Sequence, residues 1–283
     1  MKNFLIVSFC VLCSVSFAQT YNIMTYNIRY DNPNDGVNTW SKRKVYLGNQ
    51  ILYNQLDVLG IQEGLHHQVV YIDSVLTQFN YVGAGRDDAK EKGEYSAIFY
   101  NKKRLGILKE GTFWLSETPD KISVGWDASM KRICTYSLFE NTLNKEQFWV
   151  FNTHFDHIGK KARLESAKLI YEKIKEFNQT NLPVILMGDL NLKPESVAIK
   201  YLSSVMNDSK SISLLKPFGT EGTFNGFKFN QPVKDRIDYI FTSKDRIQVN
   251  KFAILSDSKD CKYPSDHLPV VVEVEFTLKT DKF

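Results

Sequence analysis

YPSDHLPVVVEVEF, residues 263 to 276, combines a strand pattern with chemically reactive side chains. From Val272 onward apolar residues alternate with glutamates, and this period of two predicts a strand with one buried face. Asp266 and His267 stand directly before that strand. One acid and one imidazole are weak support for a site by themselves, so their meaning depends on which other side chains the fold brings to them.

The rest of the chain alternates strand-like with helix-like segments. Eight further runs are rich in β-branched and aromatic residues, at residues 21–28, 57–62, 95–100, 133–140, 148–155, 183–190, 236–242 and 250–255. Apolar residues at steps of three and four predict helices over 65–79 and 164–177, and a weaker one over 47–56. A helix with one apolar stripe covers one sheet face, so the pattern favours an α+β protein with two face-to-face sheets and outer helices.

Polar residues gather where the predicted strands end, and loops at such points present side chains on a rigid scaffold. The set is Asn27, Glu63, His154, Asp156, His157, Asp189, Asn191, Asp266 and His267. Simpler structural explanations exist for several members. Asn27 could form a turn, Glu63 could interact with a helix N-terminus, and Asp189 could belong to a plain Gly-Asp turn.

Asp189 and Asn191 lie two residues apart and therefore on the same side of an extended segment. Together with Asn27 and Glu63 they offer hard oxygen donors. Mg²⁺ and Mn²⁺ take such donors while keeping several waters, and substrate phosphates often complete the shell. No thiolate stands in the cluster, which disfavours a structural zinc site.

Six motifs in one order carry a family resemblance: Asn27, Glu63, NTHF (152–155), GDLN (188–191), RIDYIF (236–241) and SDHLPV (265–270). With them the chain resembles the endonuclease/exonuclease/phosphatase superfamily, which includes DNase I-like nucleases, abasic-site endonucleases, sphingomyelinases, inositol phosphatases and nocturnin-like deadenylase domains. The resemblance covers residues 20–277 and is nearest in pattern to a secreted bacterial branch close to the nocturnin-like group. It implies a four-layered α/β/β/α sandwich with two mixed β-sheets and a divalent metal, Mg²⁺ or Mn²⁺, at its rim.

The resemblance also implies roles for individual residues. Three are placed at the metal: Asn27, Glu63 and Asp266, with Glu63 the principal ligand. Five are catalytic: His154 on the phosphate, Asp189 and Asn191 on the attacking water, Asp238 on the ring of the final histidine, and His267. Six are assigned to the substrate pocket: Arg29, Arg43, Trp126, Arg132, Asp156 and His157. An imidazole held in one tautomer by an acid is suited to proton transfer near neutral pH.

These features predict a divalent-metal-dependent phosphoesterase that hydrolyses a phosphodiester or a phosphomonoester by in-line attack of an activated water. The substrate would be a phosphorylated small molecule, a lipid headgroup or a nucleic acid. Two alternatives remain open, a secreted nuclease acting on DNA or RNA and a catalytically silent phosphate-binding module. The net charge of +4 is mild beside the dense basic stripe of tight nonspecific nucleic-acid binders, and Arg29 stands where abasic-site endonucleases carry an acid.

The N-terminus, residues 1–18, has the pattern of a signal peptide: Lys2, an apolar stretch, and small residues Ser16 and Ala18 before the expected cleavage site. Residues 19–283 would then form a single catalytic domain of a secreted or periplasmic protein, expected to be a monomer. An uncleaved N-terminal anchor is the alternative. No later run reaches about 18 apolar residues, so no transmembrane segment is expected in the mature chain. Two cysteines, at 134 and 261, remain in it, and whether they pair stays open.

Overall fold

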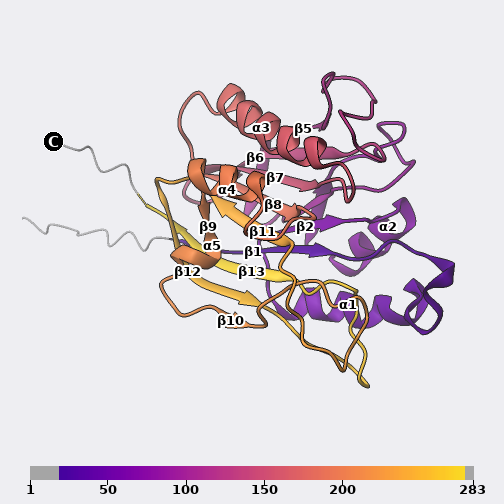
Figure 1. Ribbon diagram of the computed structural model, residues 1–283. Helices are drawn as coiled ribbons and strands as arrows, with labels where there is room; N and C mark the ends of the chain where they lie inside the picture. The colour runs from indigo at the N-terminus through magenta and orange to yellow at the C-terminus, as the bar shows by residue number, and fades with distance from the viewer. Residues whose placement is uncertain (1–18, 278–283) are drawn as a thin grey trace, which may run out of the picture.

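Two β-sheets lie face to face at the centre of the molecule, with helices against their outer faces (Figure 1). The computed structural model describes residues 19–277, so the predicted signal peptide lies outside the described residues. Helices α3 and α4 cover one sheet, and α1 and α2 cover the other. This four-layered arrangement confirms the predicted α+β sandwich with two mixed sheets.

The first sheet has seven strands in the order β10-β12-β13-β1-β2-β4-β3. Their bounds are Phe218–Gly219, Ile247–Ile254, Val270–Phe276, Thr20–Asn27, Val58–Gln62, Ile98–Asn101 and Phe79–Val82. Strand β1 runs parallel to β2 and antiparallel to β13. The C-terminal ends of β1 and β2 therefore lie beside the N-terminal start of β13, the strand that follows the Ser-Asp-His triplet.

The second sheet has six strands in the order β5-β6-β7-β8-β11-β9. Their bounds are Leu105–Trp114, Ile133–Asn141, Gln147–His154, Val184–Asp189, Asp238–Thr242 and Asn207–Asp208. Strand β8 is parallel to β7 and antiparallel to β11. The helices are η1 (Pro33–Asn38), α1 (Trp40–Tyr53), α2 (His66–Val75), α3 (Lys160–Phe177), α4 (Val197–Val205) and α5 (Ser209–Ile212).

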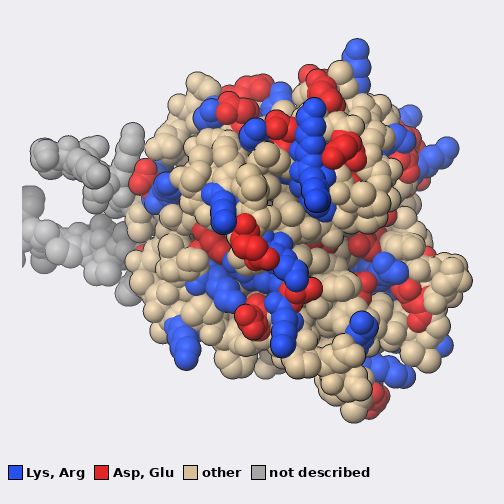
Figure 2. Space-filling view, viewed as in Figure 1, with Lys and Arg blue, Asp and Glu red and all other residues tan. Residues whose placement is uncertain are grey.

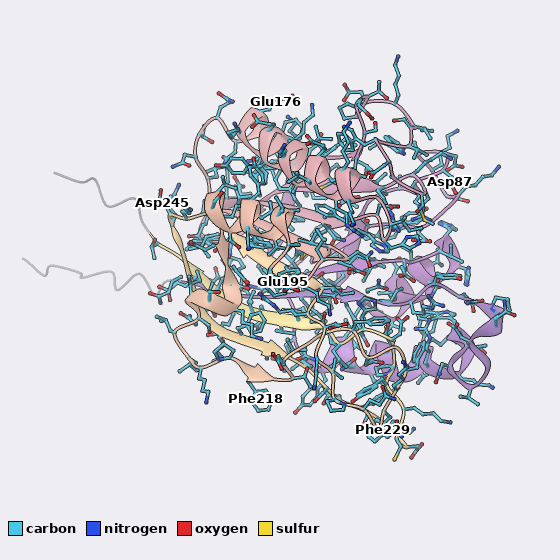
Figure 3. All side chains as sticks on the ribbon, viewed as in Figure 1. Asp87, Glu176, Glu195, Phe218, Phe229 and Asp245 are labelled. Carbon is cyan, nitrogen blue, oxygen red and sulfur yellow. The ribbon has the colours of Figure 1, made fainter. Side chains whose placement is uncertain are left out.

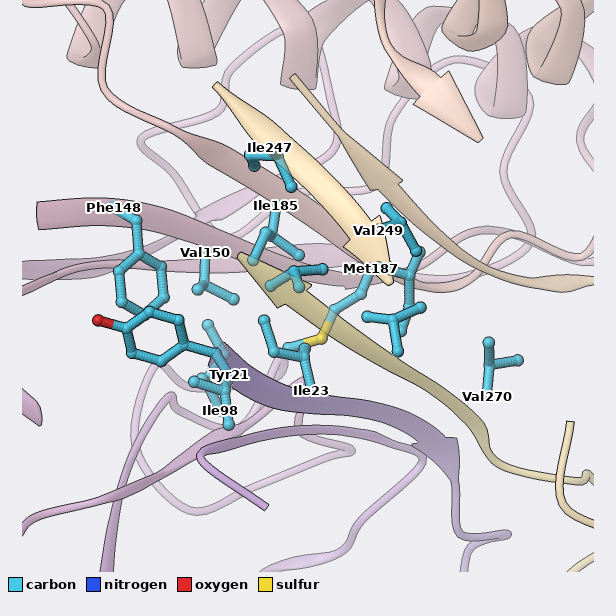
Figure 4. Close-up of a cluster of buried hydrophobic side chains, with 14 of the residues drawn as sticks. Tyr21, Ile23, Ile98, Phe148, Val150, Ile185, Met187, Ile247, Val249 and Val270 are labelled. Carbon is cyan, nitrogen blue, oxygen red and sulfur yellow. The ribbon is translucent and has the colours of Figure 1, made fainter. Parts of the chain in front are cut away.

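The core between the sheets follows from strand alternation. In β13 every second residue from Val270 to Phe276 is buried, as the opening pattern predicts. These side chains meet those of the other sheet in a cluster that includes Ile23, Ile185 and Met187 (Figure 4). The ring centroids of Tyr21 and Phe148 lie 5.1 Å apart across this layer. Burial of apolar surface at about 25 cal/mol per Å² makes this layer a main source of stability.

Two further apolar layers attach the helices. Ile170 and Ile174 of α3 pack with Phe151 of the second sheet, while Leu47 of α1 and Val69 of α2 pack against the outer face of the first. No helix within residues 19–277 is both long enough and apolar enough to cross a membrane.

Several predicted element bounds were wrong. Helix α2 ends at Val75, and Phe79 instead begins β3, where it packs on the same apolar layer. Helix α1 ends at Tyr53 and leaves Leu52 47% exposed. The edge strand β5 was missed because its central residues are exposed and show no alternation. Helix α4, which Ser196 caps through a bond from the Ile199 amide, was missed as well.

Within residues 19–277 the two cysteines are both free, Cys134 buried and Cys261 exposed. Cys134 lies in β6 under helix α3. A disulfide between them is therefore not part of this structure.

Candidate active site

Strand register sets three site residues in one row. His154, the last residue of β7, is the partner of Asp189 in β8, which in turn is the partner of Asp238 in β11. Gly188 has φ +147°, and a Cβ there would collide with the carbonyl oxygen of Thr153. The glycine thus permits the close approach that sets Asp189 beside His154.

The first sheet contributes from the facing strand ends. Asn27 ends β1 opposite Gln62 of β2, so Glu63 follows directly. Asp266 and His267 precede β13, and the His267 Nδ1 lies 2.9 Å from the Asp238 Oδ2 of the second sheet. The two sheets therefore meet at this point, and Asn27 of the first sheet also bonds to Asp189 of the second, 162 positions away in the chain.

These groups surround a cavity of about 470 Å³. Its lining consists of Arg29, Tyr30, Glu63, Glu94, Met130, Arg132, His154, His157, Asp189, Asn191, Phe224, Ile237, Asp266 and His267. Three of them, Arg29, Glu63 and Asn191, have φ between 49° and 63°. Non-glycine residues rarely adopt this conformation, and such strain clusters at functional sites.

One side of the cavity, here named the acidic wall, consists of Glu63, Asp189 and Asp266. The Asn27 amide donates to Glu63 Oε1 at 3.0 Å and to Asp189 Oδ2 at 2.9 Å. Burial, and then the charge of Asp238, raise the pKa of Asp189 to about 7. Burial and Glu63 likewise raise the pKa of Asp266. Mutual repulsion among these carboxylates favours a bound cation.

Two members of the acidic wall, together with His267, form a donor set that fits a divalent metal. One ligand atom each from Glu63, Asp189 and His267 lies within 4.8 Å of the others. Carboxylate oxygens are the hard donors that Mg²⁺ and Mn²⁺ select. Asn27 is different, because its Oδ1 accepts from the Arg29 amide and its Nδ2 faces the carboxylates. In this structure Asn27 orients Glu63 and Asp189, whereas the sequence placed it among the metal residues.

His267 is held by carboxylates on both sides. Asp238 contacts its Nδ1, and its Nε2 lies 3.7 Å from Asp189 Oδ2. Although burial favours the neutral ring, Asp238 and then Asp189 raise the pKa of His267 well above its ordinary value. The ring is also in edge contact with Phe224 at 5.1 Å between centroids. Its orientation is thereby fixed with Nε2 toward the cavity.

The opposite side, here named the basic wall, consists of Arg132, His154 and His157. Arg132 is 4% exposed, and its Nη2 lies 3.3 Å from the His157 Nδ1. Burial and the charge of Arg86 lower the pKa of Arg132, although a guanidinium keeps its proton in proteins. The basic wall therefore places a buried positive charge on the cavity.

His154 links the two walls. The Asn191 amide donates to the carbonyl oxygen of Phe155 and, with its second hydrogen, to His154 Nε2, each at 3.0 Å. A neutral ring consequently carries its proton on Nδ1. Burial and the charge of Arg132 lower the pKa of His154 well below its ordinary value. His154 is therefore neutral, with its Nδ1 3.9 Å from Glu94 Oε2 and its Nε2 3.5 Å from Asp189 Oδ2.

Three predicted substrate residues lie elsewhere. Arg43 donates to the carbonyl oxygens of Ile28, Arg29 and Pro264, so it ties the loop after β1 to the start of β13 and does not line the cavity. Asp156 is buried and accepts from the amides of residues 158 and 159. Trp126 has a positive φ and its amide donates to Glu117 outside the cavity. None of the three is among the residues that line the cavity, and the side chains of Arg43 and Asp156 bond to loop backbone instead.

Sequence reasoning missed Glu94 and Phe224, which also line the cavity. Glu94 precedes the strand of GEYSAIFY and forms two bonds of 2.8 Å with Arg86. An acid directly before a strand was the same signal that pointed to Asp266. Phe224 lies on the loop between β10 and β11. In Figure 3 the label Phe229 marks this loop, and the label Asp87 marks the loop that carries Arg86.

Comparison with known proteins now decides the family. The pattern of the endonuclease/exonuclease/phosphatase family matches residues 24–267. The chain belongs to this family. Family members are hydrolases and include phosphatases and nucleases, which supports the prediction of a phosphoric ester hydrolase. The resemblance read from the six ordered motifs is confirmed.

Solved structures of two bacterial family members are similar over nearly their whole length. A Bacteroides thetaiotaomicron family protein has a TM-score of 0.88 and 38% identity, covering 93% of this chain and 100% of that one. A mannosyl-6-phosphatase of Bacteroides thetaiotaomicron VPI-5482 has a TM-score of 0.86 and 39% identity, covering 90% and 100%. Human nocturnin is 24% identical over 266 residues, which are 86% of this chain and 60% of nocturnin. The chain thus spans about three fifths of that relative.

Proposed function

We propose that this protein is a secreted phosphatase that uses Mg²⁺ or Mn²⁺ to hydrolyse a phosphate monoester of a small polar molecule, with sugar phosphates as the leading class. The observation that carries the proposal is the convergence of Glu63, Asp189 and His267 on one small cavity. The solved structure of the mannosyl-6-phosphatase, 39% identical to this chain, supports a sugar phosphate.

The size and charge of the molecule favour a small substrate. A cavity of about 470 Å³ falls within the usual range of small-molecule sites. On the face shown in Figure 2, basic side chains are interspersed with acidic ones, and no continuous basic stripe crosses it. A duplex nucleic acid would need such a stripe to track its backbone.

Each site residue has a place in the hydrolysis of a phosphoester. Glu63 and Asp266, with the nearby oxygen of Asp189, would hold the cation, which supplies Lewis acidity and lowers the pKa of water. The backbone N–H of Asn191 donates to Asp189 Oδ1 at 2.8 Å and so orients this carboxylate. The Asp189 carboxylate takes the proton of the attacking water. His154, which Asn191 orients, lies on the phosphate side of the site, and His267 Nε2 stabilises the charge that develops on the phosphate.

Export and a monomeric state belong to the same proposal. The signal-peptide pattern of residues 1–18 supports export. Mass spectrometry of the exported protein should find Gln19 at its N-terminus. A product that retains Lys2 would contradict cleavage, and size-exclusion chromatography with light scattering tests the monomer.

The activity test compares substrates of different classes. Mannose 6-phosphate, p-nitrophenyl phosphate, bis(p-nitrophenyl) phosphate, DNA and RNA would each be assayed with Mg²⁺, with Mn²⁺ and with EDTA. We expect monoester hydrolysis that EDTA abolishes and that Asp189→Ala lowers by about 10³-fold. Asp245→Ala is the control, since Asp245 lies at the left edge of Figure 3, away from the cavity.

Other outcomes select the alternatives. Preferential cleavage of DNA or RNA would identify a nuclease. Phosphate binding without turnover of any ester would identify a silent binding module. Activity that is unchanged in Asp189→Ala would end the mechanism proposed above.

A further inference from the structure

Arg132 has more donors than the protein satisfies. The Nε and Nη1 atoms are buried and lack a hydrogen-bond partner among the described residues, as does the Nδ1 of His154. Unpaired buried donors are uncommon in folded proteins, and each costs free energy unless a partner arrives. Both residues line the cavity, so an acceptor bound there is the candidate partner for these donors.

Neighbouring acids do not supply that acceptor. Asp156 Oδ1 lies 3.6 Å from Arg132 Nε, beyond a hydrogen bond, and this carboxylate already accepts from Ser129 and from the amides of residues 158 and 159. Glu94 is engaged by both terminal nitrogens of Arg86. The charge of Arg132 is thus only partly compensated within the protein.

A single buried water also fails to satisfy the donors. Arg132 and His154 both border a small void of about 10 Å³ beside the main cavity, a volume that holds at most about one water. One water offers two acceptor positions for three donors. The oxygens of a phosphoryl group offer more acceptors and carry negative charge.

The position of Arg132 in the fold determines which oxygen of a bound phosphate it would contact. Arg132 directly precedes β6, and β6 pairs with β7 so that Cys134 is opposite Thr153. The guanidinium therefore lies beside the end of β7, next to His154, and His154 separates it from Asp189. A phosphate bound in the cavity beside His154 would turn an oxygen toward Arg132.

We propose that Arg132, supported by His157, is the specificity determinant that selects phosphate monoesters over diesters by binding the third non-bridging oxygen of the dianion. In a diester that position carries a second organic group and no charge. The buried, unpartnered guanidinium would then face an ester substituent and remain without an acceptor. This inference rests on the proposed phosphatase function and adds the residue that distinguishes monoester from diester substrates.

The test measures kcat/KM for p-nitrophenyl phosphate and bis(p-nitrophenyl) phosphate in wild type, Arg132→Met and Arg132→Lys. Loss of a charged hydrogen bond predicts a monoester decrease on the order of 10- to 100-fold in Arg132→Met, with a much smaller change for the diester. Arg132→Lys should recover part of the monoester rate. The matched control is Arg104→Met, since Arg104 pairs with Asp57 at the opposite end of β2 from Glu63.

Binding supplies a second readout that does not depend on turnover. The affinity of inorganic phosphate, measured by calorimetry, should weaken by a similar factor in Arg132→Met, whereas dimethyl phosphate should bind wild type and variant alike. An equal loss for both esters, or unchanged phosphate affinity, would overturn the inference. If wild type hydrolyses no ester, the proposed function fails, and phosphate binding alone then decides the role of Arg132. Near-ultraviolet circular dichroism confirms that the variants are folded.

Discussion

The two walls of the cavity are built in opposite ways. In the acidic wall, Asn27 joins Glu63 to Asp189 by hydrogen bonds, and Arg29 lies 3.9 Å from Glu63 and 3.7 Å from Asp266. In the basic wall, Arg132 is held by burial and leaves two donors unpaired. The acidic wall is thus arranged for a cation even without substrate, whereas the basic wall is completed only by an anion.

This difference assigns the hydrolysis itself to the acidic wall and the choice of substrate to the basic wall. Changes to the acidic wall and to His267 should affect the reaction with every ester, because those groups act on the phosphoryl centre itself. Changes to the basic wall should affect the choice among esters. The following tests examine that separation, beginning with the largest expected effect.

His267→Ala should lower kcat by about 10³-fold or more for monoesters and diesters alike, since general acid–base and transition-state contacts contribute on the order of 10² to 10⁴. The measurement is steady-state kinetics with both p-nitrophenyl esters. His66→Ala serves as the control, because His66 contacts Tyr95 outside the cavity. A loss confined to monoesters would contradict the division between the walls.

Glu63→Gln should weaken the affinity for Mg²⁺ by at least about 10-fold, the loss that even outer partners of metal ligands can cause. Titration of Mg²⁺ in thermal unfolding measures this directly, because a ligand that binds only the folded state raises its stability. Glu91→Gln is the control, with Glu91 exposed outside the cavity. Equal stabilisation of wild type and Glu63→Gln by Mg²⁺ would remove Glu63 from the metal site.

Asp156→Asn should have the smallest effect on catalysis and act on stability, with a decrease of about 1 to 3 kcal/mol in the free energy of unfolding. Burial opposes ionisation, yet hydrogen bonds from the amides of residues 159 and 158 and from Ser129 lower the pKa of Asp156 below its ordinary 3.8. The stability from this carboxylate is therefore present above pH 3.8 and is lost as the pH falls further toward the folded-state pKa.

Urea denaturation at pH 7 and at pH 3 checks this. The difference between wild type and Asp156→Asn should be largest at pH 7 and smaller at pH 3. A difference that grows on acidification would show that the carboxylate is not stabilised in the folded protein. The monoester preference should weaken slightly in this variant, because Asp156 lies beside Arg132.

Strand-end chemistry was predictable from sequence where local pattern and side-chain type agreed. GDLN and SDHLPV combine apolar strands with polar ends, and the cavity indeed includes Asp189, Asn191, Asp266 and His267. Arg43 was placed wrongly, because a long side chain can turn toward either a cavity or a backbone carbonyl. Glu94 was missed since its place at the cavity depends on the fold of the loop that carries it, where Arg86 bonds to its carboxylate.

The sequence by itself determined the layers, because side-chain periods of two and of three to four decide which faces of strands and helices avoid water. It also determined which chemical groups stand at the strand ends. Only the tertiary structure decided that Asn27 orients carboxylates, that His154 carries its proton on Nδ1, and that Arg132 keeps free donors. Those properties depend on hydrogen bonds between residues far apart in the chain, and no local pattern encodes their geometry.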